Sequence, residues 1–173
     1  KTLVGSINHN GIFAQSALPH GKPKRADLWE RRNGDYLYQV RSGLDNMKPD
    51  RPYIGIPYGR YPRIIMAFIV EEAAKTKEQI VYFGKSFRHF LRELDLDDDG
   101  RTRKGVLKQL GMLIKSEFSV IRIDEARQFE QGLGEFKISN GKYLLWGEKS
   151  REEQMELFDP YVHLSDQFFE EVL

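Results

Sequence analysis

Four regularly spaced residues could together contact a polyanion. Lys104, Lys108, Gly111 and Lys115 lie at positions i, i+4, i+7 and i+11 of one segment. Because an α-helix repeats every 3.6 residues, this spacing places all four on one helix face, which we call the lysine face. Lysine ammonium groups bind phosphate oxygens, and such contacts weaken steeply as the salt concentration rises. The pattern favours contact with nucleic acid; a lysine-rich face that only meets solvent is the competing interpretation.

Further basic residues could extend the lysine face. Arg101 and Arg103 precede it, and Lys137 and Lys142 follow in β-rich sequence, although for each of these two lysines taken alone a solvent-exposed position is the favoured interpretation. A glycine inside a helix costs ~1 kcal/mol relative to alanine, so we expect Gly111 to mark the close approach of a partner. The residues predicted to contact DNA are Arg101, Arg103, Lys104, Lys108, Gly111, Lys115, Arg122, Lys137 and Lys142.

The distribution of charge supports a surface that faces a polyanion, although the formal net charge is only +1. Residues 20–63 contain ten Lys and Arg against five Asp and Glu, and residues 100–122 contain six against one. Residues 148–173 reverse this balance, with eight acids and two bases. Two basic zones and an acidic tail are typical of a chain that binds a polyanion on one side.

Other kinds of chemistry find little support. The run Asp95 to Gly100 imitates the first half of an EF-hand loop, but Val106 occupies the position of the bidentate glutamate, so we interpret the run as a turn between helices. The four histidines share no ligand spacing, and no nucleophile motif or phosphate-cradling glycine loop is present. We therefore expect a protein without catalytic activity, metal or cofactor.

The composition favours a location in the cytoplasm. The chain has no cysteine, which fits a reducing compartment. Its longest apolar run, residues 64–70, is far shorter than the ~20 residues that span a bilayer, so no membrane contact is expected. The first residue is lysine rather than methionine, from which we expect a fragment of a longer polypeptide.

The elements that must position the lysine face form a helix–strand–helix–helix series. Apolar residues recur at helical spacing from Pro62 to about residue 75, and Pro62 suits a first helical turn. A short strand at 80–83 and a helix at 87–94 that begins near Lys85 or Ser86 come next. After a turn at 95–103, a third helix turns one apolar set inward, comprising Val106, Leu107, Leu110, Leu113, Ile114 and Phe118.

Two Asn-Gly pairs predict β-hairpins on either side of the helices. Asn33-Gly34 separates strands at 28–32 and 35–40, and it favours a type I′ turn. Asn140-Gly141 likewise separates residues 136–138 from residues 142–146. We also expect a short strand or helical turn near 12–17, a linker or exposed helical turn at 149–158, a strand at 161–164 and a final helix capped by Ser165.

These elements predict an α+β fold: a winged helix, in which a helix-turn-helix is followed by a β wing, with an N-terminal β-hairpin extension. We divide the chain into an arm with a hairpin at 1–50, a winged-helix domain at 51–148, and a segment at 149–173 that links to a second domain.

The order of several motifs resembles that of the plasmid-encoded RepA-type replication initiators. Residues 55–68, Gly-Ile-Pro-Tyr-Gly-Arg-Tyr-Pro-Arg-Ile-Ile-Met-Ala-Phe, are similar to the hallmark that opens a helix in this family. Residues 83–94 resemble its Gly-x-Ser-x-x-x-Phe-x-x-x-Leu helix. Leu-Pro-His at 18–20 and Arg-Arg-Asn-Gly at 31–34 precede them, and residues 157–158 and 164–169 follow. The turn before the third helix is acidic here, whereas relatives often have glycine and threonine.

The resemblance covers roughly residues 11–173 and implies a plasmid replication initiator fragment. Such a protein would bind double-stranded DNA at origin repeats, recruit host replication proteins and form a homodimer. The first hairpin offers Trp29, Tyr36 and Tyr38 as a surface for dimerisation, although packing on the domain's own core explains these residues equally well. The alternatives are a module that serves mainly for protein–protein contact, and a winged-helix transcriptional regulator.

Overall fold

The structure, a computed structural model, describes residues 18–147 and 159–173. The strand or turn expected near 12–17 and the segment expected at 149–158 lie outside the described residues. The described part contains four helices and seven strands, and its fold is mixed α+β. In chain order the elements are β1 (Leu28–Asn33), β2 (Tyr36–Arg41), α2 (Arg60–Thr76), β3 (Ile80–Tyr82), α3 (Phe87–Glu93), α4 (Gly100–Lys115), β4 (Glu117–Asp124), β5 (Phe129–Lys137), β6 (Ser139–Leu144), β7 (Tyr161–Leu164) and α6 (Asp166–Val172).

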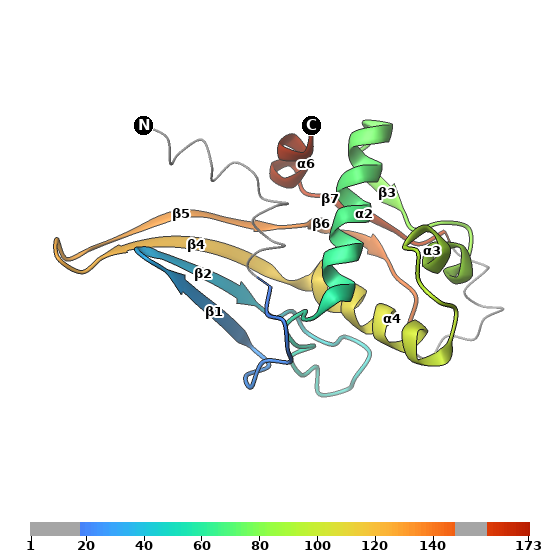
Figure 1. The fold of residues 1–173 in the computed structure, drawn as a ribbon, viewed down its shortest axis with the longest axis horizontal. Helices are drawn as coiled ribbons and strands as arrows, with labels where there is room; N and C mark the ends of the chain where they lie inside the picture. Colours follow the sequence, from blue (N-terminus) through green and yellow to red (C-terminus); the bar gives the residue numbers. More distant parts are fainter. Residues whose placement is uncertain (1–17, 148–158) are drawn as a thin grey trace.

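Two antiparallel sheets organise the strands. The larger sheet has the order β1-β2-β4-β5 and the smaller sheet the order β3-β7-β6. Figure 1 shows the β4–β5 hairpin as a long ribbon that leads away from the helices, with β1 and β2 beside it. The helices α2, α3 and α4 and the smaller sheet gather at the other end of the molecule (Figure 1).

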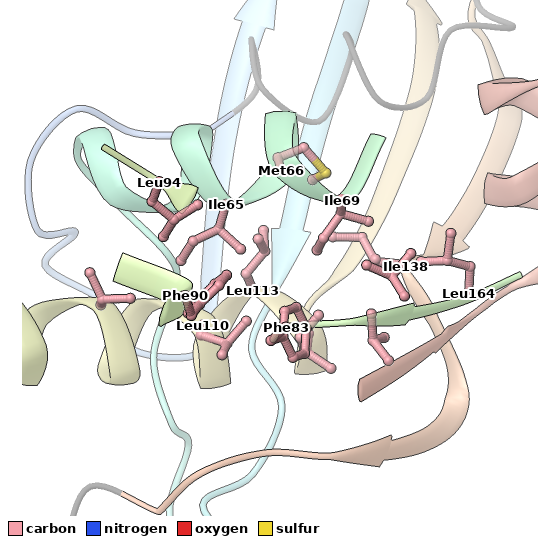
Figure 2. Packing of buried hydrophobic residues seen from close by; sticks show 14 of the residues in the cluster. Ile65, Met66, Ile69, Phe83, Phe90, Leu94, Leu110, Leu113, Ile138 and Leu164 are labelled. Atoms are coloured by element: carbon pink, nitrogen blue, oxygen red, sulfur yellow. The ribbon is translucent and has the colours of Figure 1, made fainter. Parts of the chain in front are cut away.

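The core lies where α2, α3, α4 and the smaller sheet meet. Ile65 of α2, Phe90 of α3, Leu113 of α4 and Leu164 of β7 all have no exposed surface. Figure 2 shows these side chains converging on one another and on Phe83. The 3.6-residue apolar spacing of α2 and α4 gives each helix one continuous buried side, which leaves the other side for polar residues.

Local capping residues set the starts of the helices, as expected from the sequence. Pro62 lies in the first turn of α2, and the Ser86 hydroxyl accepts the backbone N–H of His89 at the start of α3. The third helix begins at Gly100, whereas we predicted a turn that extends to residue 103. The earlier start is explained by the Asp99 carboxylate, which accepts the Thr102 N–H at 2.8 Å and caps the helix. The acidic run therefore serves as a turn and helix cap, as we interpreted it.

The first predicted hairpin is confirmed, but its turn type differs. Asn33 pairs with Tyr36, so the two loop residues are Gly34 and Asp35 rather than Asn33 and Gly34. Of these two residues only Gly34 has a positive φ, at 62°. Glycine at the first loop position is typical of a type II′ turn, which also matches the twist of the strands.

The second predicted hairpin is wrong. Residues 136–137 belong to β5 and pair with β4, whereas β6 pairs with β7. Ser139 lies opposite Leu164 and Tyr143 opposite Val162, so Asn140-Gly141 forms a bulge within β6 instead of a chain reversal. The Asn140 side chain accepts the Lys142 N–H at 3.0 Å, and this bond closes the bulge locally.

The C-terminal residues pack into the same core. We assigned residues 149–173 to a linker and a second domain; in the structure β7 is the central strand of the smaller sheet. Ser165 caps α6 as expected, and Phe168 is fully buried with its ring 6.4 Å from that of Phe136. Within the described residues no helix has the length and apolar character to cross a membrane.

Candidate nucleic-acid interface

The start of α4 is held by ion pairs that remove one predicted cation from the open surface. Asp98 contacts the Arg88 guanidinium at 2.9 Å and the Arg103 guanidinium at 3.4 Å. Arg103 also lies over the Phe87 ring, 5.4 Å from its centroid. The Arg103 side chain is 22% exposed. We therefore assign Arg103 a structural contribution, which ties α4 to α3, in addition to its predicted DNA contact.

The N-terminal half of the lysine face is open. Arg101 and Lys104 are exposed, and Lys108 is half-buried with its Nζ 5.9 Å from the centroid of the Tyr58 ring. None of these three cations forms a salt bridge within the described part of the chain, although the Arg101 charge helps to lower the pKa of the nearby Asp99 carboxyl. Unpaired cations near a helix N-terminus can bind an anion without first breaking an ion pair.

The C-terminal half of the lysine face is covered by the protein itself, contrary to our expectation of an open face. Lys115 Nζ donates a hydrogen bond to the Leu44 carbonyl at 3.3 Å. Burial lowers the pKa of the Lys115 ammonium below its usual range, and the nearby Asp45 carboxylate partly opposes this shift. At Gly43, an added Cβ would lie 2.6 Å from the Lys115 Cβ, which shows how tightly the covering segment packs.

Gly111 has a neighbour from the same chain. A Cβ at this position would meet Ile54 Cδ1 at 3.5 Å, and Ile54 belongs to the segment 43–58 that covers this half of α4. We expected the glycine to mark the approach of an external partner. The neighbour at this position is Ile54, and 3.5 Å is an ordinary van der Waals distance, so the packing here does not itself require glycine.

The predicted cations of the sheets lie on separate elements. Arg122 is near the far end of β4, over the Phe129 ring at 5.5 Å, and β4 leads away from α4 (Figure 1). Lys137 of β5 contacts the Glu117 carboxylate at 3.8 Å, and Lys142 is exposed in the β6 bulge. The structure therefore does not bring the nine predicted DNA-contacting residues into one patch.

The aromatic residues of the first hairpin are half-buried. Trp29 pairs with Val40 across β1 and β2, and Tyr38 lies two residues before Val40, so all three side chains share one face of the sheet. Val40 is fully buried, and Trp29 and Tyr38 pack against the core beside it. Tyr36 is half-buried at the far end of this face. Packing on the protein's own core thus accounts for part of the Trp29 and Tyr38 surface.

Sequence reasoning overlooked Arg60, Tyr58 and Gln109. These residues meet beside the open half of the lysine face, because the Tyr58 N–H donates to Gln109 Oε1 at 2.9 Å. Arg60 was treated only as part of a helix start. Its position two residues before Pro62, at the predicted start of a helix, was the signal in the sequence that could have revealed it.

The Asp99 cap predicts a specific dependence of stability on pH. The Thr102 N–H donates to this carboxylate and holds the pKa of Asp99 below its usual value. A group with a lowered folded pKa stabilises the fold above its unfolded pKa of about 3.9, and this contribution is lost as the pH falls through the folded value. The thermal midpoint of the wild-type protein should therefore exceed that of Asp99→Asn at neutral pH, and the difference should shrink between about pH 5 and pH 2. A constant difference across this range would contradict the cap.

Among residues 18–147 and 159–173, no three His, Asp or Glu side chains are grouped so that they could hold a metal ion.

Comparison with known proteins finds one matching family model and two solved structures with a similar fold. A family model described as plasmid-encoded RepA protein matches residues 56–173. The crystal structure of RctB domains 2–3 is similar with a TM-score of 0.60 at 13% sequence identity, covering 94% of this chain and 58% of that chain. A structure of selenomethionine derivatives of domains 2 and 3 of RctB has a TM-score of 0.55 at 12% identity, with 99% and 61% covered. At these identities the likeness concerns the fold, and the chain spans less than two thirds of either solved chain. No curated protein matches.

Proposed function

The chain belongs to the family of plasmid-encoded RepA proteins, and from this premise we propose that it is a replication initiator domain that binds double-stranded DNA at a plasmid origin without catalysing a reaction. The observation that carries the proposal is the open N-terminal half of the lysine face, where Arg101, Lys104 and Lys108 form no salt bridge with any described residue. We place the protein in the cytoplasm, with host replication proteins as further partners.

We further propose that α2, β3, α3 and α4 with the β4–β5 hairpin act as a winged helix. The order helix–strand–helix–helix–hairpin supports this assignment, as does the short turn between α3 and α4. In helix-turn-helix proteins the second helix enters the major groove with its N-terminal residues against the bases. This arrangement would bring Arg101 and Lys104 to the DNA first.

The salt dependence of DNA binding tests this function. Fluorescence anisotropy with a labelled duplex should show an affinity that falls by about 0.9 log units per log unit of salt for each phosphate contact. A family of duplexes that includes the repeats of the cognate plasmid origin separates specific from general binding. Absence of duplex binding at low salt would overturn the proposed function.

A second candidate function, dimerisation through the first hairpin, rests on the position of β1. This strand is the outermost strand of the larger sheet, so one of its edges lacks a neighbouring strand among the described residues. An open strand edge can pair with a second copy of the same chain. Trp29 lies on β1 itself, and Tyr36 and Tyr38 lie on the adjacent strand β2, one strand away from such a contact.

Replacing Tyr36 by alanine tests dimerisation. Tyr36 is better suited than Trp29 because it lies at the end of the hairpin, farther from the core. Sedimentation velocity should show a dimer dissociation constant about tenfold higher for Tyr36→Ala, whereas Tyr53→Ala, at a tyrosine that is 55% exposed in another segment, should leave it unchanged. A wild-type protein that sediments as a monomer at all concentrations would exclude this function for the chain.

A further inference from the structure

A surface hollow lies between the first turn of α2 and the open half of the lysine face. Its volume is about 280 Å³, and it is lined by residues 58–61 together with Gly105, Lys108 and Gln109 of α4. Gly105 permits this close crossing of the two helices, because a Cβ there would lie 2.7 Å from the Tyr61 ring. The hollow is therefore bounded by one helix start and by the middle of a second helix.

The charge around this hollow is positive and uncompensated. Arg60 and Lys108 line it, and no acidic residue does. The Arg60 guanidinium lies 5.3 Å from the centroid of the Tyr61 ring, and Lys108 lies against Tyr58 in the same way. Neither cation makes an ion pair with any described residue. Contacts with aromatic rings hold a cation in place and leave its charge available to an anion.

Gln109 provides a buried hydrogen-bond donor in the wall of the hollow. The side chain is only 4% exposed, and its Oε1 accepts the Tyr58 N–H at 2.9 Å. This bond fixes the orientation of the amide, because only the oxygen can accept. The Nε2 group then remains as a donor, and it has no partner among the described residues. Since no fully buried side-chain nitrogen or oxygen among the described residues lacks a partner, this Nε2 group is reached by solvent, and an acceptor that enters the hollow can hydrogen-bond to it.

The start of α2 adds the backbone N–H groups of Arg60 and Tyr61, whereas Pro62 has no N–H and the Gly59 N–H already donates to the Pro19 carbonyl. The first turn of this 17-residue helix has no side-chain cap, and its N-cap residue Gly59 has a φ of 80°. The N-terminal amides of a helix carry partial positive charge and bind anions such as phosphate. At most helix starts a serine or aspartate side chain takes this place, as Asp99 does in α4.

We infer that this hollow binds one phosphate group of the DNA backbone, with Gln109 Nε2 as a donor and with Arg60 and Lys108 as the balancing charges. The inference rests on the proposed function, because it adds a positioning contact to the DNA-binding face. A phosphate held at the start of α2 fixes how far α4 can turn in the groove. Such contacts set the register of a protein on the duplex and carry no base specificity.

Neutralising Arg60 gives the first test. Arg60→Gln should weaken the binding of a labelled duplex about tenfold. It should also reduce the magnitude of the slope of log affinity against log salt by about 0.9, the value that corresponds to one phosphate contact. Lys75→Gln is the matched control, because Lys75 is exposed at the opposite end of the same helix. Arg60 is itself exposed, so its replacement leaves the core intact. Equal salt slopes for Arg60→Gln, Lys75→Gln and the wild type would overturn the inference.

Gln109→Glu tests the buried donor separately. The variant keeps an acceptor for the Tyr58 N–H but replaces the Nε2 donor by a carboxylate oxygen, which repels phosphate. Its duplex affinity should fall about tenfold or more, while circular dichroism and urea unfolding report whether the fold persists. Unchanged affinity in a folded variant would overturn the inference. If Gln109→Glu does not fold, the inference is decided by Arg60→Gln alone, because that substitution does not touch the core.

Two further outcomes separate the inference from the proposed function. If the wild type binds no duplex, both the proposed function and the phosphate site are wrong. If the wild type binds duplex and the two variants bind it as well as the wild type does, only the phosphate site is wrong. In an ¹⁵N spectrum, the Gln109 side-chain amide signal should shift when duplex is added. A shift with inorganic phosphate at equal ionic strength, but none with duplex, would assign the hollow to a free anion and overturn the DNA assignment.

Discussion

Exchanging both Lys104 and Lys108 for glutamate should lower the affinity for duplex DNA on the order of 100-fold near 0.1 M salt. The two side chains lie one turn apart on the open half of the lysine face, and neither has a carboxylate partner in the described structure. Each substitution removes one phosphate contact and adds a repelling charge. The magnitude of the slope of log affinity against log salt should therefore fall by about 1.8, the value that corresponds to two phosphate contacts. Titration by fluorescence anisotropy at several salt concentrations measures this slope.

The control must carry the same change in net charge. Lys75→Glu combined with Lys77→Glu meets this requirement, because both lysines are exposed at the C-terminal end of α2, away from the open half of α4. This pair should retain most of the affinity. If the control loses as much affinity as Lys104→Glu with Lys108→Glu, binding depends on total charge and α4 has no special place in it.

Lys115 provides a contrast within the lysine face. Its half-buried side chain packs against the segment 43–58, and its ammonium donates to the Leu44 carbonyl, so a contact with DNA would have to compete with this bond. Lys115→Gln should therefore change the duplex affinity far less than Lys104→Gln does. Equal losses for the two variants would mean that the segment 43–58 opens in the complex.

The helices could be predicted because their signals are local. The apolar residues of α4 repeat every three or four positions, and Leu110 and Leu113 are buried as this spacing requires. Ser86, Asp99 and Ser165 each accept a backbone N–H three residues later, which is the pattern that short polar side chains favour at helix starts. These interactions need no information from distant parts of the chain.

The choice of strand partners could not be predicted in the same way. The Asn140-Gly141 pair is compatible with a hairpin turn and with a bulge, since both require a positive φ at glycine, which is 100° at Gly141. The decision came from β7, more than fifteen residues later, whose Val162 and Leu164 are buried at the centre of the smaller sheet. A pattern within a short stretch of sequence cannot show which distant strand a segment will pair with.

The lysine face shows a similar limit for the candidate site. Periodicity identifies which residues share one side of α4, but it cannot say what covers that side. The segment 43–58 folds back over the C-terminal half and leaves only the part near Lys104 and Lys108 open. Gly43 allows this close packing, and the signal of Gly111 in the sequence was ambiguous, because a helical glycine fits an external partner as well as a neighbouring segment.

Replacing Phe90 by alanine should lower the free energy of unfolding by about 3–5 kcal/mol, the range typical of a buried phenylalanine. Phe90 has no exposed surface and lies edge-to-face with Phe68 at 5.4 Å and with Phe83 at 5.3 Å. Its ring centroid is also 5.7 Å from that of Trp146. Removal of the ring would leave a cavity shared by α2, α3 and the region after β6, and none of these elements can close it alone. Urea unfolding at constant pH measures the change.

The contrast with Phe129→Ala shows why the expected loss is a property of the core. Phe129 is 37% exposed at the start of β5, where its main recorded contact is the Arg122 guanidinium, so its removal should cost less than about 1 kcal/mol. Phe90→Leu should fall between the two, because leucine refills part of the cavity. Since Phe90 joins α3 to the same core that supports α4, a variant as stable as Phe129→Ala would mean that α3 does not hold α4 in place. The open cations would then lack the rigid support on which their contact with DNA depends.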